Sequence, residues 1–205
     1  MNFFNIDGPF QRIGSLVFDI MVLGLLWTFI SILGFGVTIG AVTTALYTSV
    51  YFNIVKDEGY VYKTFFKTLK NKFLKSTIVW LILVALYVLM YFNITSITGG
   101  FLDIQWLLPV YFSLTIELLF ITLYIFPLMS TSELGIKKLF KYSFILANKH
   151  LPTTLLSVIV TVALLALLYM INNVLLIIIL APIQCYLLSR LITKKILTQY
   201  DTKAW

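Results

Sequence analysis

Hydrophobic residues form long, continuous runs along this chain, separated by short polar segments. About 20 apolar residues are needed for a helix to cross the hydrocarbon core of a bilayer, which is ~30 Å thick. The runs show no period-two alternation of the kind that strands require. The pattern predicts an all-α fold, a polytopic helical membrane bundle with six spanning helices, at residues 16–34, 38–55, 77–95, 105–128, 152–170 and 174–193.

The composition supports a membrane location for the whole chain. Of its 205 residues, 60% are hydrophobic and only 11% are charged, which is too little charge to cover a water-soluble domain. No linker divides the apolar runs. Residues 1–205 are therefore expected to form a single integral membrane domain in contact with the lipid bilayer.

Positive charge gives the expected orientation. With six spans, all fifteen lysines and arginines fall on one side, and the opposite loops GFGV, ITSITGGFLDIQ and INN contain no basic residue. Basic loops remain in the cytoplasm, so the basic loops and both termini are predicted to be cytoplasmic. Segment 38–55 is diluted by threonines, tyrosines and Asn53. If it does not cross, five spans remain, the amino terminus lies outside, and Arg12 alone breaks the rule.

Small residues recur every four positions in GVTIGAVTTALYT, at residues 36–48. On a helix, one stripe consists of Gly36, Gly40, Thr44 and Thr48, and a second row beside it begins with Ala41 and Ala45. Small residues let helices approach closely in lipid, where van der Waals packing replaces the hydrophobic drive. The stripe is predicted to pack against another span or against a partner subunit.

The segment GYVYKTFFKTLKNKFLKS combines aromatic and basic residues at helical spacing. It is predicted to be a cytoplasmic amphipathic helix on the inner leaflet, joined to the third span. Its lysines would bind anionic lipid of that leaflet or a cytoplasmic protein, and nucleic acid is excluded because no base-reading motif accompanies them. The expected apolar face is Phe65, Phe66, Leu69 and Phe73, and the expected basic residues are Lys63, Lys67, Lys70 and Lys75.

Two carboxylates lie inside apolar runs. Asp19 is a turn inside the first span, within reach of water or Arg12, and is expected to be an anchor. Glu117 is near the middle of the fourth span, where a charge is costly unless it is paired, hydrated or neutral. It is expected to face the bundle interior, with hydroxyls of Thr43, Thr44 and Tyr47 as candidate partners. A structural role and a proton- or substrate-linked role both remain open.

Catalytic chemistry finds little support in the sequence. The chain has one histidine and one cysteine, which excludes a His/Cys metal site and a Cys-His pair, and it contains no phosphate-binding glycine loop. Trp80 is expected to be an anchor at the inner membrane interface. No cofactor and no metal are predicted, and the protein is not expected to be an enzyme.

Several stretches resemble the YesL family, a bacterial membrane family of poorly defined function. The likeness is carried by FNIDGP, TIGAVTTALY, DEGYVYKTFFKTLKNKFLKSTIVWLIL, LYIFPLMS and LFKYSFILANKHLPTTLL, in this order along nearly the whole chain. The resemblance implies a location in a bacterial cell membrane. Members are frequently encoded beside carbohydrate ABC importers, so it also implies a link to sugar uptake. The expected function is a non-enzymatic accessory or scaffold subunit of a transport system, with ABC permease and ATPase subunits as partners. A stand-alone transporter or channel and a membrane regulator of envelope state are the alternatives.

Overall fold

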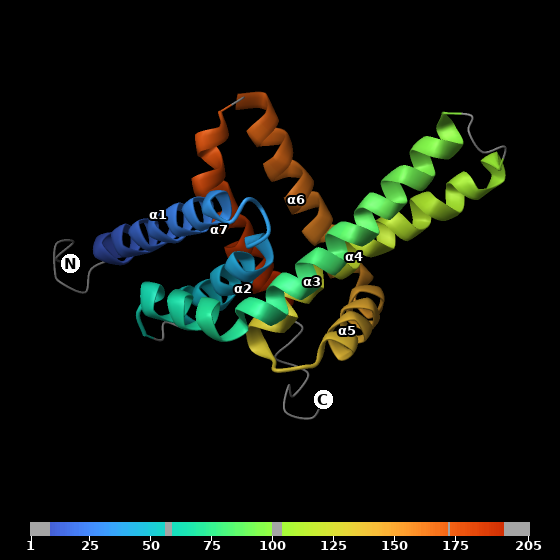
Figure 1. Cartoon of the computed structure of the whole chain (residues 1–205). Coiled ribbons are helices and arrows are strands. Elements are labelled where there is room, and N and C mark those ends of the chain that lie inside the picture. The colour runs from blue at the N-terminus through green and yellow to red at the C-terminus, as the bar shows by residue number, and fades with distance from the viewer. Residues whose placement is uncertain (1–8, 56–58, 100–103, 172, 195–205) are drawn as a thin grey trace.

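The computed structural model describes residues 9–55, 59–99, 104–171 and 173–194, and these residues contain helices and no strand. The all-α prediction is confirmed for this part of the chain. Two π-helical turns, Val50–Val55 and Ser189–Lys194, and two 3₁₀ turns, Gln105–Leu107 and Val174–Leu176, extend the helices. The α-helices, shown in Figure 1, are α1 (Pro9–Leu33), α2 (Ile39–Ser49), α3 (Val61–Thr98), α4 (Leu108–Thr131), α5 (Ile136–Lys149), α6 (Leu151–Ile171) and α7 (Ile177–Leu188).

Four of the described helical segments are long and apolar enough to cross a membrane: Gly14–Leu33, Val61–Thr98, Gln105–Thr131 and Leu151–Ile171. The segments Ile39–Val55 and Ile177–Ile192 are also apolar helices, but they are shorter. A helix of 17 residues such as Ile39–Val55 spans about 25 Å, somewhat less than a ~30 Å hydrocarbon core. Helix therefore forms at each of the six predicted ranges, and four of these helices have the full length.

The predicted amphipathic helix and the third span form one continuous helix. Helix α3 has 38 residues, a length of about 57 Å, so it is much longer than a bilayer core. In Figure 1 its first turns lie along the lower edge of the molecule, and its remaining turns rise beside α4. The basic turns are thus an extension of a spanning helix.

Helix α2 lies at the centre of the bundle, in contact with α1, α3, α4 and α7. Nine of its eleven residues are buried, and Thr44 and Thr48 donate their hydroxyls to carbonyls four residues earlier, so the small polar side chains carry their own hydrogen bonds. A side chain at Gly40 would meet the Cβ of Trp80 and lie 2.6 Å from the carbonyl oxygen of Ser76 on α3. Small residues are needed here because α2 and α3 approach each other so closely.

Gly36 does not belong to the helical stripe. The helix begins at Ile39, and Gly36 lies in the preceding turn with φ +80°, a left-handed conformation that favours glycine. The small-residue row therefore starts at Gly40. Because Gly40, Ala41, Thr44, Ala45 and Thr48 are buried within this chain, they pack internally and are not available to a partner subunit.

Helices α1 and α7 make a second close contact. A Cβ placed on Gly24 would overlap the backbone carbonyl of Ile178 and lie 3.1 Å from Cγ of Pro182. Pro182 lies inside α7 and has no N–H to donate, which locally weakens the helical hydrogen bonding. The absence of a side chain at Gly24 is what lets α1 approach this helix.

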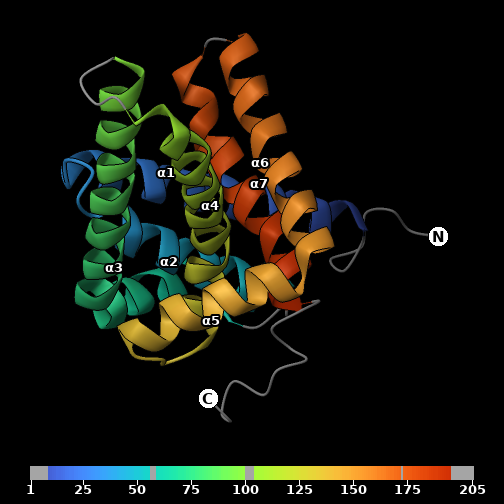
Figure 2. The ribbon, with the colours of Figure 1, turned by 90° about the vertical axis from the view of Figure 1, so that its right-hand side faces the viewer.

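The basic segments gather at one end of the bundle. The start of α3 contacts Val50–Val55, Ser189–Lys194 contacts both Val50–Val55 and α4, and α5 packs against α4. Figure 2 shows α5 lying across this end of the molecule. Thr154, in the first turn of α6, links this helix to α4 and α5. Its hydroxyl contacts the Tyr124 hydroxyl of α4 at 2.9 Å and donates to the Ala147 carbonyl of α5 at 2.8 Å. We call the end of the bundle formed by the start of α3, by α5 and by Ser189–Lys194 the basic end.

Candidate functional site

The exposed lysines of the basic end form a surface on two helices. Lys63, Lys67 and Lys70 are exposed on the first turns of α3, and the exposed lysines of α5 are Lys137, Lys138, Lys141 and Lys149. The Lys63 ammonium also lies 4.9 Å from the centre of the Tyr60 ring. We call these seven lysines the basic surface. The side chains of Arg12, Lys56, Lys194, Lys195 and Lys203, which the sequence places on the same side, lie outside the described residues.

His150 adds little positive charge to this surface near pH 7. It closes α5, where its N–H donates to the Leu146 carbonyl. Burial is the main cause that lowers the pKa of His150 below its ordinary value, and the neighbouring Lys149 charge is the smaller cause. The charge of the surface near pH 7 therefore comes from lysine.

The predicted apolar face of the amphipathic helix is divided between two environments. Phe65 is completely buried and Leu69 packs against the core, whereas Phe66 and Phe73 are 50% and 41% exposed. The division arises because α3 packs against α2 and α4 along one side and does not lie free on a surface. Phe66 and Phe73 remain available for contact with lipid beside the basic surface.

Lys72 has a structural position that the sequence interpretation missed. Its ammonium donates to the carbonyls of Met129 at 2.8 Å and Ser132 at 3.3 Å, and it lies 2.9 Å from the Glu133 carboxylate. These carbonyls are at the C-terminal end of α4, where carbonyls lack partners within the helix and where positive charge is favoured. Lys75 lies half-buried close to this pair. Lys72 thus joins the basic part of α3 to α4.

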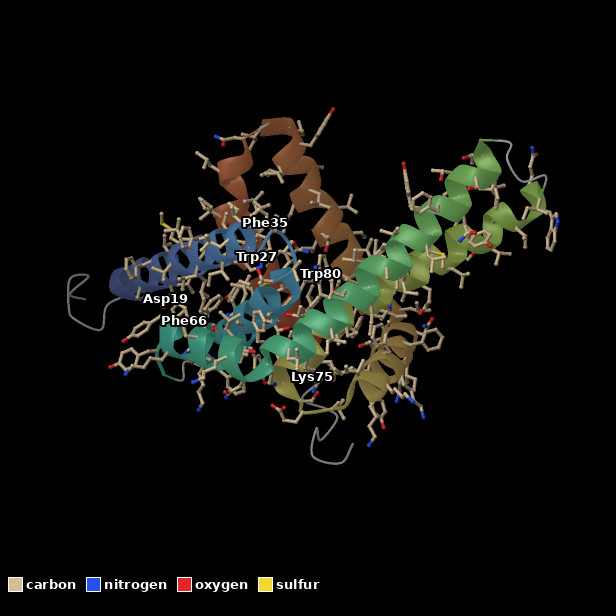
Figure 3. The ribbon with its side chains drawn as sticks, in the orientation of Figure 1. Asp19, Trp27, Phe35, Phe66, Lys75 and Trp80 are labelled. Atoms are coloured by element: carbon tan, nitrogen blue, oxygen red, sulfur yellow. The ribbon has the colours of Figure 1, made fainter. Side chains whose placement is uncertain are left out.

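A cavity of about 400 Å³ lies between the helices. Its wall is formed mostly by aliphatic and aromatic side chains of α1, α2, α3, α4, α6 and α7. Figure 3 shows Trp27 and Trp80 close to the turn that carries Phe35. The Trp80 indole donates to the Gly36 carbonyl at 3.0 Å, so Trp80 lies beside the α1–α2 turn and lines the cavity.

Five residues of the cavity wall carry hydroxyl, amide or thiol groups: Thr43, Tyr47, Thr122, Gln184 and Cys185. The Trp27 indole donates to Thr43 Oγ1 at 3.1 Å, and Gln184 Nε2 donates to the Thr161 hydroxyl at 3.3 Å. The Tyr47 hydroxyl lies beside the Cys185 thiol. This wall contains no charged side chain.

Neither intramembrane carboxylate lines the cavity. Asp19 is half-buried on α1, and the side chain of Arg12, its expected partner, lies outside the described residues. Glu117 is half-buried on α4, where its Oε1 accepts a hydrogen bond from Asn148 Nδ2 of α5 at 2.7 Å. Two of the hydroxyls expected to bind Glu117 have other partners, because Thr43 accepts from Trp27 and Thr44 donates to Gly40. The third, that of Tyr47, lies beside Cys185.

Glu117→Gln is expected to change the free energy of unfolding by less than about 1 kcal/mol. Glutamine keeps an amide oxygen that can accept the Asn148 hydrogen bond at a half-buried position. Thermal melting in detergent measures the effect, and Glu117→Leu, which removes the acceptor, is the control expected to be less stable than Glu117→Gln. A large loss of stability with glutamine would show that the negative charge itself is required.

Among the described residues, no group of three or more histidine, cysteine, aspartate or glutamate side chains is close enough to hold a metal ion. The single cysteine is buried beside Tyr47. The chemistry that the site offers is thus hydrogen bonding by a few neutral groups inside the bundle and positive charge on its basic end.

The family described as "Protein of unknown function, DUF624" matches residues 20–94. This family is commonly called YesL, so the match agrees with the resemblance over this part of the chain. The matched range contains most of α1, all of α2 and most of α3, with Gly24 and Gly40, both cavity tryptophans and the lysines of α3. No curated protein and no solved structure matches the chain.

Proposed function

We propose that this chain is a non-enzymatic accessory or scaffold subunit of a membrane transport system, and that its basic surface binds a cytoplasmic partner. The proposal includes the six-span topology, in which Ile39–Val55 and Ile177–Ile192 cross a locally thin part of the bilayer and the basic end is cytoplasmic. In this arrangement the described exposed lysines lie on one side, as the distribution of positive charge in membrane proteins requires.

The proposal rests on one observation: both helices of the basic surface are held against α4. The lysines of this surface are on two helices, α3 and α5, and both helices are held against α4: α3 by the Lys72 contacts and α5 by packing and the Asn148–Glu117 hydrogen bond. A preformed array of charges loses little conformational entropy when it binds, so it suits recognition of an acidic protein surface. Anionic lipid would add roughly 1 kcal/mol per lysine near the membrane.

The small-residue row cannot be the partner-binding face, because it is buried inside this chain. Transport through the bundle is also less well supported than an accessory role, because the cavity wall is mainly apolar and offers few groups to a hydrated solute. The resemblance to the YesL family favours a carbohydrate ABC importer as the transport system, with its permease and ATPase subunits as partners.

Purification in mild detergent tests this proposal. We expect permease and ATPase subunits to co-elute with the chain, and we expect the triple variant Lys63→Gln, Lys67→Gln, Lys70→Gln to reduce their recovery about tenfold. The matched Lys→Arg triple variant keeps the charge and should retain the partners. Salt at about 1 M, where screening acts within ~3 Å, should release them. A lone, homogeneous protein that moves solute in liposomes would contradict an accessory role.

A further inference from the structure

The cavity between the helices is a partly open pocket, and it is larger than the voids found in ordinary packing. Protein interiors are packed as densely as organic crystals, and voids larger than one water molecule are few. A volume of about 400 Å³ falls in the range of pockets that bind small molecules, about 300–1,000 Å³. The wall combines aliphatic and aromatic side chains with a few neutral polar groups, which is the usual composition of such pockets.

The wall restricts the chemistry of a ligand. Because none of the lining residues is charged, an ionic ligand would lose its hydration without gaining a partner. A free sugar has several hydroxyl groups, and each would need a hydrogen-bond partner that this wall does not supply. A neutral molecule with a mainly apolar body fits best.

Two polar groups of the wall retain hydrogen-bonding capacity. Thr43 accepts from Trp27, but within the described part of the chain its own hydroxyl has no acceptor, unlike the hydroxyls of Thr44 and Thr48. Gln184 donates to Thr161, and its amide oxygen has no donor among the described residues. Thr122 is satisfied, because it donates to the Leu118 carbonyl and contacts the Tyr87 hydroxyl. Thr43 can therefore donate to a ligand, and Gln184 can accept from one.

The cavity is bordered by α6, an apolar helix whose side chains are mostly exposed. Leu164, Leu165 and Leu168 of α6 line it, and Leu165 is also 58% exposed. Figure 1 shows the α3–α4 pair and the α6–α7 pair diverging away from the basic end. An apolar molecule could therefore pass from the bilayer into the cavity beside α6 without crossing water.

We propose that the cavity binds one neutral, mainly apolar molecule from the bilayer, of the long-chain alcohol class, whose single hydroxyl group bonds to Thr43 and Gln184. Its chain occupies the space between Trp27, Trp80 and the leucines of α6. This binding site does not depend on the proposed role of the basic surface, which lies on the outside of α3 and α5.

Tryptophan fluorescence provides a direct test, because Trp27 and Trp80 line the cavity. The other two tryptophans, Trp106 and Trp205, are replaced by phenylalanine so that the emission reports the cavity alone. The purified protein in detergent is titrated with a dibrominated long-chain alcohol, with the dibrominated hydrocarbon of the same length, and with the corresponding fatty acid. Bromine quenches an indole only on close approach.

We expect saturable quenching by the alcohol, with weaker binding of the hydrocarbon and of the charged fatty acid. Ala181→Phe, which fills the cavity, should weaken alcohol binding at least tenfold, and Leu167→Phe, on the exposed side of α6 outside the lining, should not. Thr43→Val and Gln184→Leu should each reduce the preference for alcohol over hydrocarbon by about tenfold, the equivalent of one hydrogen bond. This ratio would not respond to a purely structural effect.

Three results would overturn the proposal: quenching that does not saturate, equal binding of alcohol and hydrocarbon, or binding that Ala181→Phe leaves unchanged. The first and third would show that the bromines reach the tryptophans from ordinary surrounding lipid or detergent, and the second would show that the cavity does not recognise a hydroxyl group. A melting curve establishes that each variant is folded. If Ala181→Phe does not fold, the ratio measured with Thr43→Val and Gln184→Leu decides.

Discussion

Gly24→Ala is expected to lower the melting temperature of the protein by roughly 6–12 °C, which corresponds to about 3 kcal/mol for a chain of this size. The added methyl group would overlap the backbone carbonyl of Ile178, which can move only if α7 moves. Helices α1 and α7 would then have to separate, and the packing around Pro182 would be lost with it. Melting followed by size-exclusion chromatography in mild detergent measures the effect.

Gly14→Ala is the matched control, because it makes the same change on the same helix. A Cβ at Gly14 meets no atom within 4 Å, and alanine is the better helix former by about 1 kcal/mol. This variant should melt at the wild-type temperature or slightly above it. If Gly24→Ala melts at the same temperature as Gly14→Ala, the close approach of α1 and α7 does not exist.

Lys72→Met is expected to reduce the free energy of unfolding by about 2–4 kcal/mol. Each hydrogen bond that involves a charged group contributes roughly 1.5–3 kcal/mol, and the ammonium makes two such bonds to the end of α4. Methionine is close to lysine in length and apolar, so it fills the space but leaves the Met129 and Ser132 carbonyls without this partner. Unfolding by heat or denaturant measures the loss.

Two further variants separate the contributions at this position. Lys70→Met removes an exposed lysine two residues earlier and should have little effect. Glu133→Gln should cost no more than about 1 kcal/mol, because the Glu133 side chain is 82% exposed and surface ion pairs contribute little. Equal stability of Lys72→Met and Lys70→Met would mean that Lys72 does not hold α3 to α4.

The spacing of residues predicts which face of a helix is buried. Lys72 shows that sorting residues by type alone can assign the wrong face. Sorting the segment by residue type places Lys72 with the other lysines. Its spacing from Phe65, Ser76, Val79 and Leu83 places it in the middle of the buried stripe, where the structure confirms it. The signal was therefore available as periodicity. The periodicity does not show what Lys72 contacts, because the end of α4 is about 60 residues away along the chain.

The hydrophobic pattern by itself determined the helices of this protein, because the length and polarity of each run are local properties. The spacing of small residues predicted the close packing of α2, and the positions of the lysines predicted the basic end. Only the tertiary structure decided which helices meet. It buried the small-residue row inside the chain, paired Glu117 with Asn148, and brought Trp27 and Trp80 to one cavity. These are contacts between segments distant in sequence, and they depend on helix orientations that no single segment encodes.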